Sequence, residues 1–129
     1  MRRVPLQRTL VLYVIDEATD EVAATIEESG RLAKQLHLWD GPSPSVFDAD
    51  TDGIRTVGIG LRFDDPLPAA DRPGVIRLLE HAAVASQTLG VCLEVQLDGT
   101  PLGLVAPEGL QPWVAETLRR ELSLDVPAL

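Results

Sequence analysis

Residues 91–105, with the sequence VCLEVQLDGTPLGLV, decide the C-terminal half of the fold. Apolar and polar side chains alternate from Val91 to Leu97, and a second apolar run extends from Leu102 to Val105. Alternation with a period of two is typical of a half-buried strand, and Asp-Gly between two such runs is a strong hairpin signal. We therefore predict a β-hairpin that turns at Asp98-Gly99, with a positive φ at the glycine.

A helix is predicted on each side of this hairpin. The helix before it has apolar residues at helical spacing from Val75 to Leu89, Pro73 in its first turn and Gly90 at the C-terminal cap position. The helix after it has an apolar stripe made of Leu110, Trp113, Val114, Leu118 and Leu122. Because a stripe on one side of a helix packs against the core, we expect all of these side chains to be buried.

The N-terminal half is predicted to hold two strands separated by a helix and a long loop. The segment Thr9–Ile15 is apolar at both parities, which is typical of a strand covered on both faces. The segment Ile54–Phe63 alternates, and two glycines leave one of its faces bare. A helix is expected from Asp16 to about His37, and the Pro-, Ser-, Asp- and Gly-rich segment from Asp40 to Gly53 is expected to be loop.

The predicted order is strand, helix, strand, helix, strand, strand, helix, in an α/β domain with a mixed four-stranded sheet. This order resembles the thioredoxin-like fold over about Thr9–Ser123, with Leu97-Asp98-Gly99-Thr100 where that family has its final hairpin turn. The resemblance implies the fold without redox chemistry. The first strand is followed by Asp16-Glu17-Ala18-Thr19-Asp20, where thioredoxins carry two cysteines.

The alternative architecture is an open two-layer sandwich, with all helices on one side of the sheet. The outer parity of the third strand carries Cys92, Glu94 and Gln96, which favours this alternative. If the first two strands are parallel, Asp16 and Asp64 lie at the same end of the sheet. Crevices beyond the carboxyl ends of strands bind ligands in open α/β sheets, so such a cluster would be a candidate site.

Composition narrows the class of protein. With 129 residues, 45% of them hydrophobic, the chain is expected to form one domain over residues 1–129, with flexible ends at 1–8 and 124–129. The net charge of −9 repels phosphate backbones and anionic lipids, so neither nucleic acid nor a membrane surface is an expected partner. The single cysteine excludes an intramolecular disulfide, and no apolar run resembles a signal or a membrane span. We therefore expect a cytoplasmic protein.

One short segment has the pattern of a metal site. Asp48-Ala49-Asp50-Thr51-Asp52-Gly53 resembles the first half of an EF-hand-type calcium loop, which implies Asp48, Asp50 and Asp52 as calcium ligands. The second half is missing, because Ile59 stands where the family has a bidentate glutamate. The other interpretation is an Asp-rich turn, since Asp and Gly are common turn residues. We expect no cofactor, with calcium at this loop as the alternative.

The leading functional interpretation is a non-enzymatic protein-interaction module, such as an adaptor, inhibitor, chaperone-like or immunity-type protein, that binds a basic protein partner. The expected interface is the long loop, with the residues Trp39, Asp40, Phe47, Asp48, Asp50 and Asp52. A metal- or small-molecule-binding regulatory domain that uses the Asp48–Gly53 loop is the second interpretation. An enzyme made from converging carboxylates is the third, and a homodimer is left open.

Overall fold

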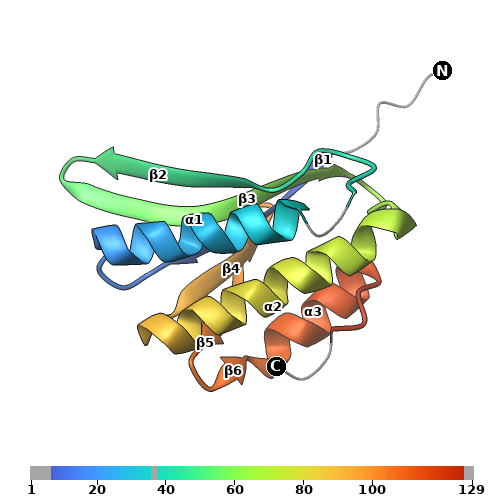
Figure 1. Cartoon of the computed structure of the whole chain (residues 1–129). Helices are drawn as coiled ribbons and strands as arrows, with labels where there is room; N and C mark the ends of the chain where they lie inside the picture. The colour runs from blue at the N-terminus through green and yellow to red at the C-terminus, as the bar shows by residue number, and fades with distance from the viewer. Residues whose placement is uncertain (1–6, 36–37, 127–129) are drawn as a thin grey trace.

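The computed structural model describes residues 7–35 and 38–126. Over these residues it contains three α-helices and one six-stranded sheet (Figure 1). The elements in chain order are β1 (Gln7–Val14), α1 (Asp20–Gln35), β2 (Ser45–Thr51), β3 (Ile54–Asp64), a short 3-10 helix (Ala69–Asp71), α2 (Arg72–Leu89), β4 (Leu93–Leu97), β5 (Thr100–Ala106), β6 (Gly109–Leu110) and α3 (Pro112–Leu122). The predicted α/β class is confirmed.

The sheet differs from the prediction in its size and direction. Its order is β2-β3-β1-β4-β5-β6, and every neighbouring pair is antiparallel, so the predicted mixed four-stranded sheet is wrong in detail. The missed strands are β2, which lies within the predicted loop, and the two-residue β6. Because β1 and β3 are antiparallel, Gln7 pairs with Asp64, so Asp16 and Asp64 lie towards opposite ends of the sheet.

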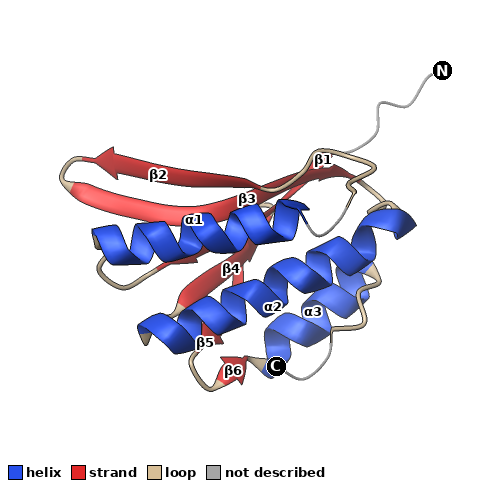
Figure 2. Cartoon of the chain, in the orientation of Figure 1, coloured by secondary structure: helices blue, strands red, loops and turns tan. Residues whose placement is uncertain are grey.

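All three helices lie on the same face of the sheet (Figures 1 and 2). Helix α1 packs against α2 and β3, and both α2 and α3 contact β5. This arrangement is the open two-layer sandwich. A sheet with helices on one face only leaves its second face, called the outer face below, without a covering layer.

The core fills the space between the sheet and the helices. Inward-facing side chains of the central strands, such as Leu12, Ile59 and Val95, are buried completely. The outward-facing Val11 and Tyr13 of β1 are only half-buried. The prediction that β1 is covered on both faces is therefore wrong, because its apolar outer side chains are shielded by neighbouring strands and not by a second layer of helices.

The C-terminal helix confirms part of the predicted core and corrects part of it. Leu118 is completely buried, as expected, whereas Trp113 is 55% exposed. Trp113 lies in the first turn of α3, where the guanidinium of Arg120 lies 5.5 Å from the centre of its ring. A cation over an indole face is an attractive contact that does not need burial. The prediction from helical spacing that Trp113 is buried is therefore wrong.

Some described residues near the two ends belong to the fold. Gln7 and Arg8 pair with β3 as part of β1, and Leu124 is completely buried. Flexible ends at 1–8 and 124–129 remain a prediction, in which Gln7, Arg8 and Leu124 are the residues held by these contacts. Residues 1–6 and 127–129, as well as the predicted end of the first helix at His37, lie outside the described residues.

Candidate functional site

The Asp48–Gly53 segment is the end of a strand and the turn of a β-hairpin, and not a loop. Strands β2 and β3 pair from Ser45 opposite Gly60 to Thr51 opposite Ile54, and the chain reverses at Asp52-Gly53. Asp52 has φ 53° and Gly53 has φ 80°, the same values that Asp98 and Gly99 have in the predicted hairpin. Two successive positive φ angles characterise the type I′ turn, so the pairs Asp52-Gly53 and Asp98-Gly99 make the same turn.

This geometry separates the expected calcium ligands. Asp48 and Asp50 are extended on β2, whereas Asp52 is in the turn, and a strand does not wrap around a cation as a calcium loop does. Within residues 7–35 and 38–126, no group of three or more His, Cys, Asp or Glu residues is placed to hold a metal ion. The structure therefore does not bring Asp48, Asp50 and Asp52 together as a metal site.

Arg55 on β3 binds two of the carboxylates at this hairpin. Its Nε and Nη2 donate hydrogen bonds to Asp48 at 2.9 and 2.7 Å, and its Nη1 donates to Asp20 at 2.7 Å. Asp20 is the first residue of α1, so Arg55 links the hairpin to the start of the helix. The hydrogen bond from Arg55 lowers the pKa of Asp48, and the hydrogen bonds with Asp48 and Asp20 raise the pKa of Arg55.

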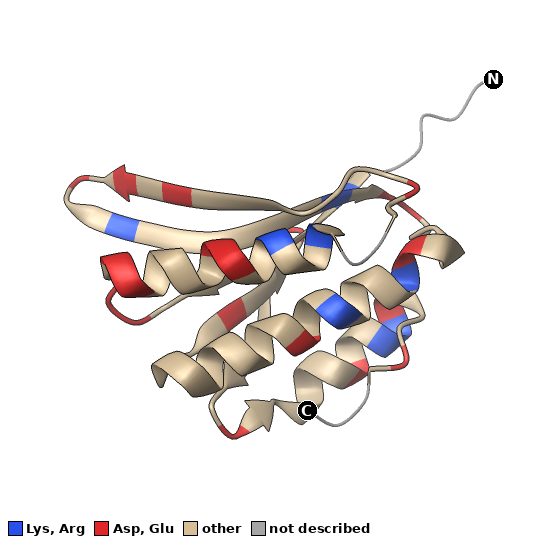
Figure 3. Ribbon diagram, viewed as in Figure 1, with Lys and Arg blue, Asp and Glu red and all other residues tan. Residues whose placement is uncertain are grey.

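The hairpin turn lies beside the loop that follows β1. Together these segments form what we call the acidic end, which carries Asp16, Glu17, Asp20, Asp48, Asp50 and Asp52 (Figure 3). Among the described residues, the ion pairs at this end are those of Arg55 with Asp20 and Asp48. Most of the negative charge at the acidic end is therefore not neutralised by a neighbouring cation.

Two exposed isoleucines lie within the acidic end. Ile15 is 48% exposed and Ile54 is 69% exposed. Both line one hollow of about 430 Å³, together with Asp16, Glu17, Ala18, Gly53 and Arg55. The sequence pattern places both isoleucines at the ends of predicted strands, and it predicts no functional role for them. The Asp-Gly pair at 52–53 was the signal that could have placed Ile54 beside a turn.

The outer face of the sheet continues from this hollow with aromatic side chains. Phe47 on β2 pairs with Gly58 on β3, which in turn pairs with Tyr13 on β1. The Tyr13 hydroxyl hydrogen-bonds to Glu94, and this bond raises the pKa of Tyr13. Gln96 donates a second hydrogen bond to Glu94 at 2.8 Å. The outer face therefore combines half-buried aromatic rings, one of them over Gly58, with an ordered polar group.

The two predicted interface residues nearest the helix end are not part of the acidic end. Trp39 is half-buried and packs against the core, and the Asp40 N–H donates to the Asp71 carboxylate at 2.7 Å. Both precede β2, whereas Asp52 follows it, and a seven-residue strand spans roughly 20 Å. The predicted interface is therefore divided, with Trp39 and Asp40 at one end and Asp52 at the other.

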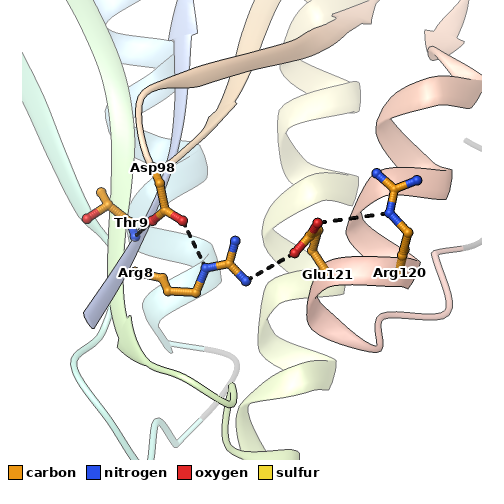
Figure 4. A network of polar contacts seen from close by, with 5 residues as sticks. All are labelled: Arg8, Thr9, Asp98, Arg120 and Glu121. Carbon is orange, nitrogen blue, oxygen red and sulfur yellow. Dashed lines mark hydrogen bonds and ion pairs between the residues drawn. The ribbon is translucent and has the colours of Figure 1, made fainter. Parts of the chain in front are cut away.

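A second polar cluster joins the first strand to the last helix. Asp98, Arg8, Glu121 and Arg120 alternate in charge along this cluster (Figure 4). Arg8 lies 2.9 Å from Asp98 and 3.5 Å from Glu121, and the Thr9 N–H donates to Asp98 at 2.9 Å. Because acids and bases neutralise each other here, we assign this cluster to stability and not to ligand binding.

The single cysteine lies next to the acidic end but is not an activated nucleophile. The Cys92 N–H donates to the Asp16 carboxylate at 2.7 Å, which fixes the loop after β1. Burial raises the pKa of Cys92, and the charges of Asp16 and Glu108 raise it further. A thiol that resists ionisation is poorly suited to nucleophilic chemistry.

Comparisons with known protein families, curated proteins and solved structures found no match to this chain. In the part of the chain that the structure describes, no helix has the length and apolar character needed to cross a bilayer.

Proposed function

We propose that this protein is a non-enzymatic interaction module that binds a basic protein partner through the acidic end. The proposal depends on one observation, the exposed pair Ile15 and Ile54 in a hollow that is bordered by the carboxylates of Asp16 and Glu17 and by Arg55, whose own charge is paired with Asp20 and Asp48. Protein interfaces commonly have an apolar centre and a polar rim. In such a surface the apolar groups supply most of the affinity, and the rim charge speeds association and rejects partners of like charge.

The chemistry of the surface indicates what the partner presents. A hollow of about 430 Å³ has room for an apolar side chain of the partner between the two isoleucines. The carboxylates around it favour lysine or arginine beside that side chain. The net charge of −9 acts in the same direction at longer range and opposes nucleic acid and anionic lipid. An adaptor, an inhibitor, a chaperone-like protein and an immunity-type protein all fit this description.

The proposal is tested by affinity capture from the native cell with matched surface variants. Ile54→Ser removes an apolar group from the hollow, and Val84→Ser is the control, because Val84 is also aliphatic and 59% exposed but lies on α2. We expect the wild type and Val84→Ser to retain the same basic partner and Ile54→Ser to lose it. A partner that Ile54→Ser retains as well as the wild type does would contradict the proposal.

A further inference from the structure

We propose that the partner of the acidic end adds a strand to the sheet along β2, as an extended segment with lysine or arginine at alternate positions. This inference rests on the function proposed above and identifies the kind of segment that is bound. It follows from three properties of β2: its position in the sheet, the direction of its backbone groups and the charge of its side chains.

Among the residues that the structure describes, strand β2 is the long free edge of the sheet. The strand order ends with β2 on one side and with β6 on the other, and β6 has only two residues against seven in β2. Figure 1 shows β2 along the outer margin of the sheet. An edge strand offers a row of unpaired backbone N–H and C=O groups, and extended peptides bind to such edges by strand addition.

The hairpin turn determines which backbone groups face outward. Thr51 and Ile54 flank a two-residue turn, so their backbone groups hydrogen-bond to each other. Hydrogen-bonded and non-bonded pairs alternate in an antiparallel ladder. The N–H and C=O groups of Asp50 and Asp48 therefore point away from β3, while those of Ala49, between them, point towards it.

The charge on this edge determines which kind of strand can pair with β2. Of the two residues whose backbone groups point outward, Asp48 already pairs with Arg55. The Asp50 carboxylate has no ion pair among the described residues, and Asp52 follows in the turn. A second copy of the chain would place aspartates against aspartates, and opposed like charges destabilise strand pairing. A basic segment would place cations against them. The edge therefore disfavours a homodimer through β2 and favours a basic partner strand.

The strand inference also agrees with the position of the hollow. The edge of β2 ends at Thr51, and the hollow with Ile54 and Gly53 lies at the same end. A segment that pairs along β2 can continue beyond the turn and place an apolar side chain between Ile15 and Ile54. Backbone pairing and the apolar anchor would then form one continuous interface.

The first test uses a synthetic peptide of alternating lysine and valine, as long as β2, and follows amide hydrogen exchange by NMR. We expect the exchange of the Asp48 and Asp50 amides to slow at least about tenfold on binding, since each gains a backbone hydrogen bond. The Ala49 amide is the internal control, because it is already directed at β3.

The same peptide with N-methylated amides keeps its charge but cannot pair, so we expect it to bind at least about tenfold more weakly. Unchanged exchange at Asp48 and Asp50, equal binding of the N-methylated peptide, or no binding at low salt would each overturn strand addition.

The second test uses the captured partner and a pair of substitutions at one position. Asp50→Asn removes the charge alone, whereas Asp50→Pro also removes the outward N–H, which an edge strand tolerates without losing its pairing to β3. We expect Asp50→Pro to weaken binding about tenfold more than Asp50→Asn does, because strand addition needs that donor. Equal weakening by the two variants overturns strand addition. Since the proposed function is tested separately by Ile54→Ser, its failure is distinguishable from the failure of this inference.

Discussion

The ring of Phe47 covers Gly58, its pairing partner across the β2–β3 hairpin, so closely that a Cβ atom at position 58 would lie 2.6 Å from its Cζ. The same Cβ would also clash with the backbone of β1, at the Leu12 carbonyl and at 2.8 Å from the Tyr13 Cα. Backbone atoms cannot move aside as a flexible side chain can. Gly58 is therefore required for the close approach of β3 to the backbone of β1.

We expect Gly58→Ala to lower the free energy of unfolding by about 1–3 kcal/mol, which is typical of overpacking. Gly60→Ala is the matched control, because a Cβ at position 60 has nothing within 4 Å. Chemical denaturation of the two variants checks the prediction. A Gly58→Ala variant as stable as Gly60→Ala would show that the sheet can widen at this position.

The two Asp-Gly turns should respond alike to the loss of their glycines. Gly53 and Gly99 both have φ 80°, and a Cβ in this left-handed conformation costs about 1–2 kcal/mol. We expect Gly53→Ala and Gly99→Ala each to lower the melting temperature. Gly60→Ala should not lower it, because the φ angle of Gly60 is not in the left-handed range. A Gly99→Ala variant with an unchanged melting temperature would contradict the turn assignment.

Only one of these two identical turns was predicted from the sequence, and the reason is physical. The turn at Asp98-Gly99 joins strands that both face the core, so apolar residues alternate around it. The turn at Asp52-Gly53 follows an edge strand whose residues from Asp48 onward are exposed, so nothing apolar marks the strand. Hydrophobic periodicity reports burial, and it therefore misses a strand that buries little.

The acidic end was only partly predictable for a related reason. Phe47, Asp48, Asp50 and Asp52 were identified as interface residues from the sequence, and the structure places all four on β2 or in its turn. The contribution of Ile15 and Asp16 depends on the antiparallel pairing of β1 with β3. Strand direction leaves no mark on the alternation pattern, so the parallel alternative could not be excluded without the structure.

Leu118 provides a test of the core that is independent of the site. It is completely buried on α3, and its replacement by Ala removes three carbon atoms and leaves a cavity. We expect Leu118→Ala to lower the free energy of unfolding by about 2–5 kcal/mol, whereas Val84→Ala, at an exposed position of α2, should cost much less. Urea denaturation measures both variants. Equal costs would show that α3 does not pack on the sheet as described.

The ionisation of Asp98 should make the stability of the fold depend on pH. Burial by itself would raise the pKa of Asp98, but the hydrogen bonds from the Thr9 N–H and from Arg8 keep it below its ordinary value. A carboxyl whose pKa is lower in the folded state stabilises the fold above its unfolded pKa of about 4 and loses that contribution as the pH falls through the folded value. Asp98→Asn preserves the turn, since Asn accepts a positive φ.

We therefore expect Asp98→Asn to melt at a lower temperature than the wild type at pH 7, with the difference shrinking below about pH 4. Asp125→Asn is the control, because it removes the same charge from an exposed position outside the Arg8 network. Thermal melts across the acid range check the prediction. A difference that stays constant down to the lowest pH would mean that ionisation of Asp98 is not the cause.

The kinetics of partner binding should separate the charges of the acidic end from its apolar groups. Carboxylates at a rim act mainly on association, so reversing Asp50 and Asp52 to Lys should slow association and flatten its dependence on salt. Ile54→Ser should instead speed dissociation, because apolar anchors hold a formed complex.

Trp39→Ala should lower the melting temperature and leave both rate constants nearly unchanged, since Trp39 packs against the core, away from the acidic end. Surface plasmon resonance at several ionic strengths measures these effects. An association rate indifferent to salt and to the two reversed charges would exclude the acidic end and direct the search to the outer face around Gly58, Gly60, Glu94 and Gln96.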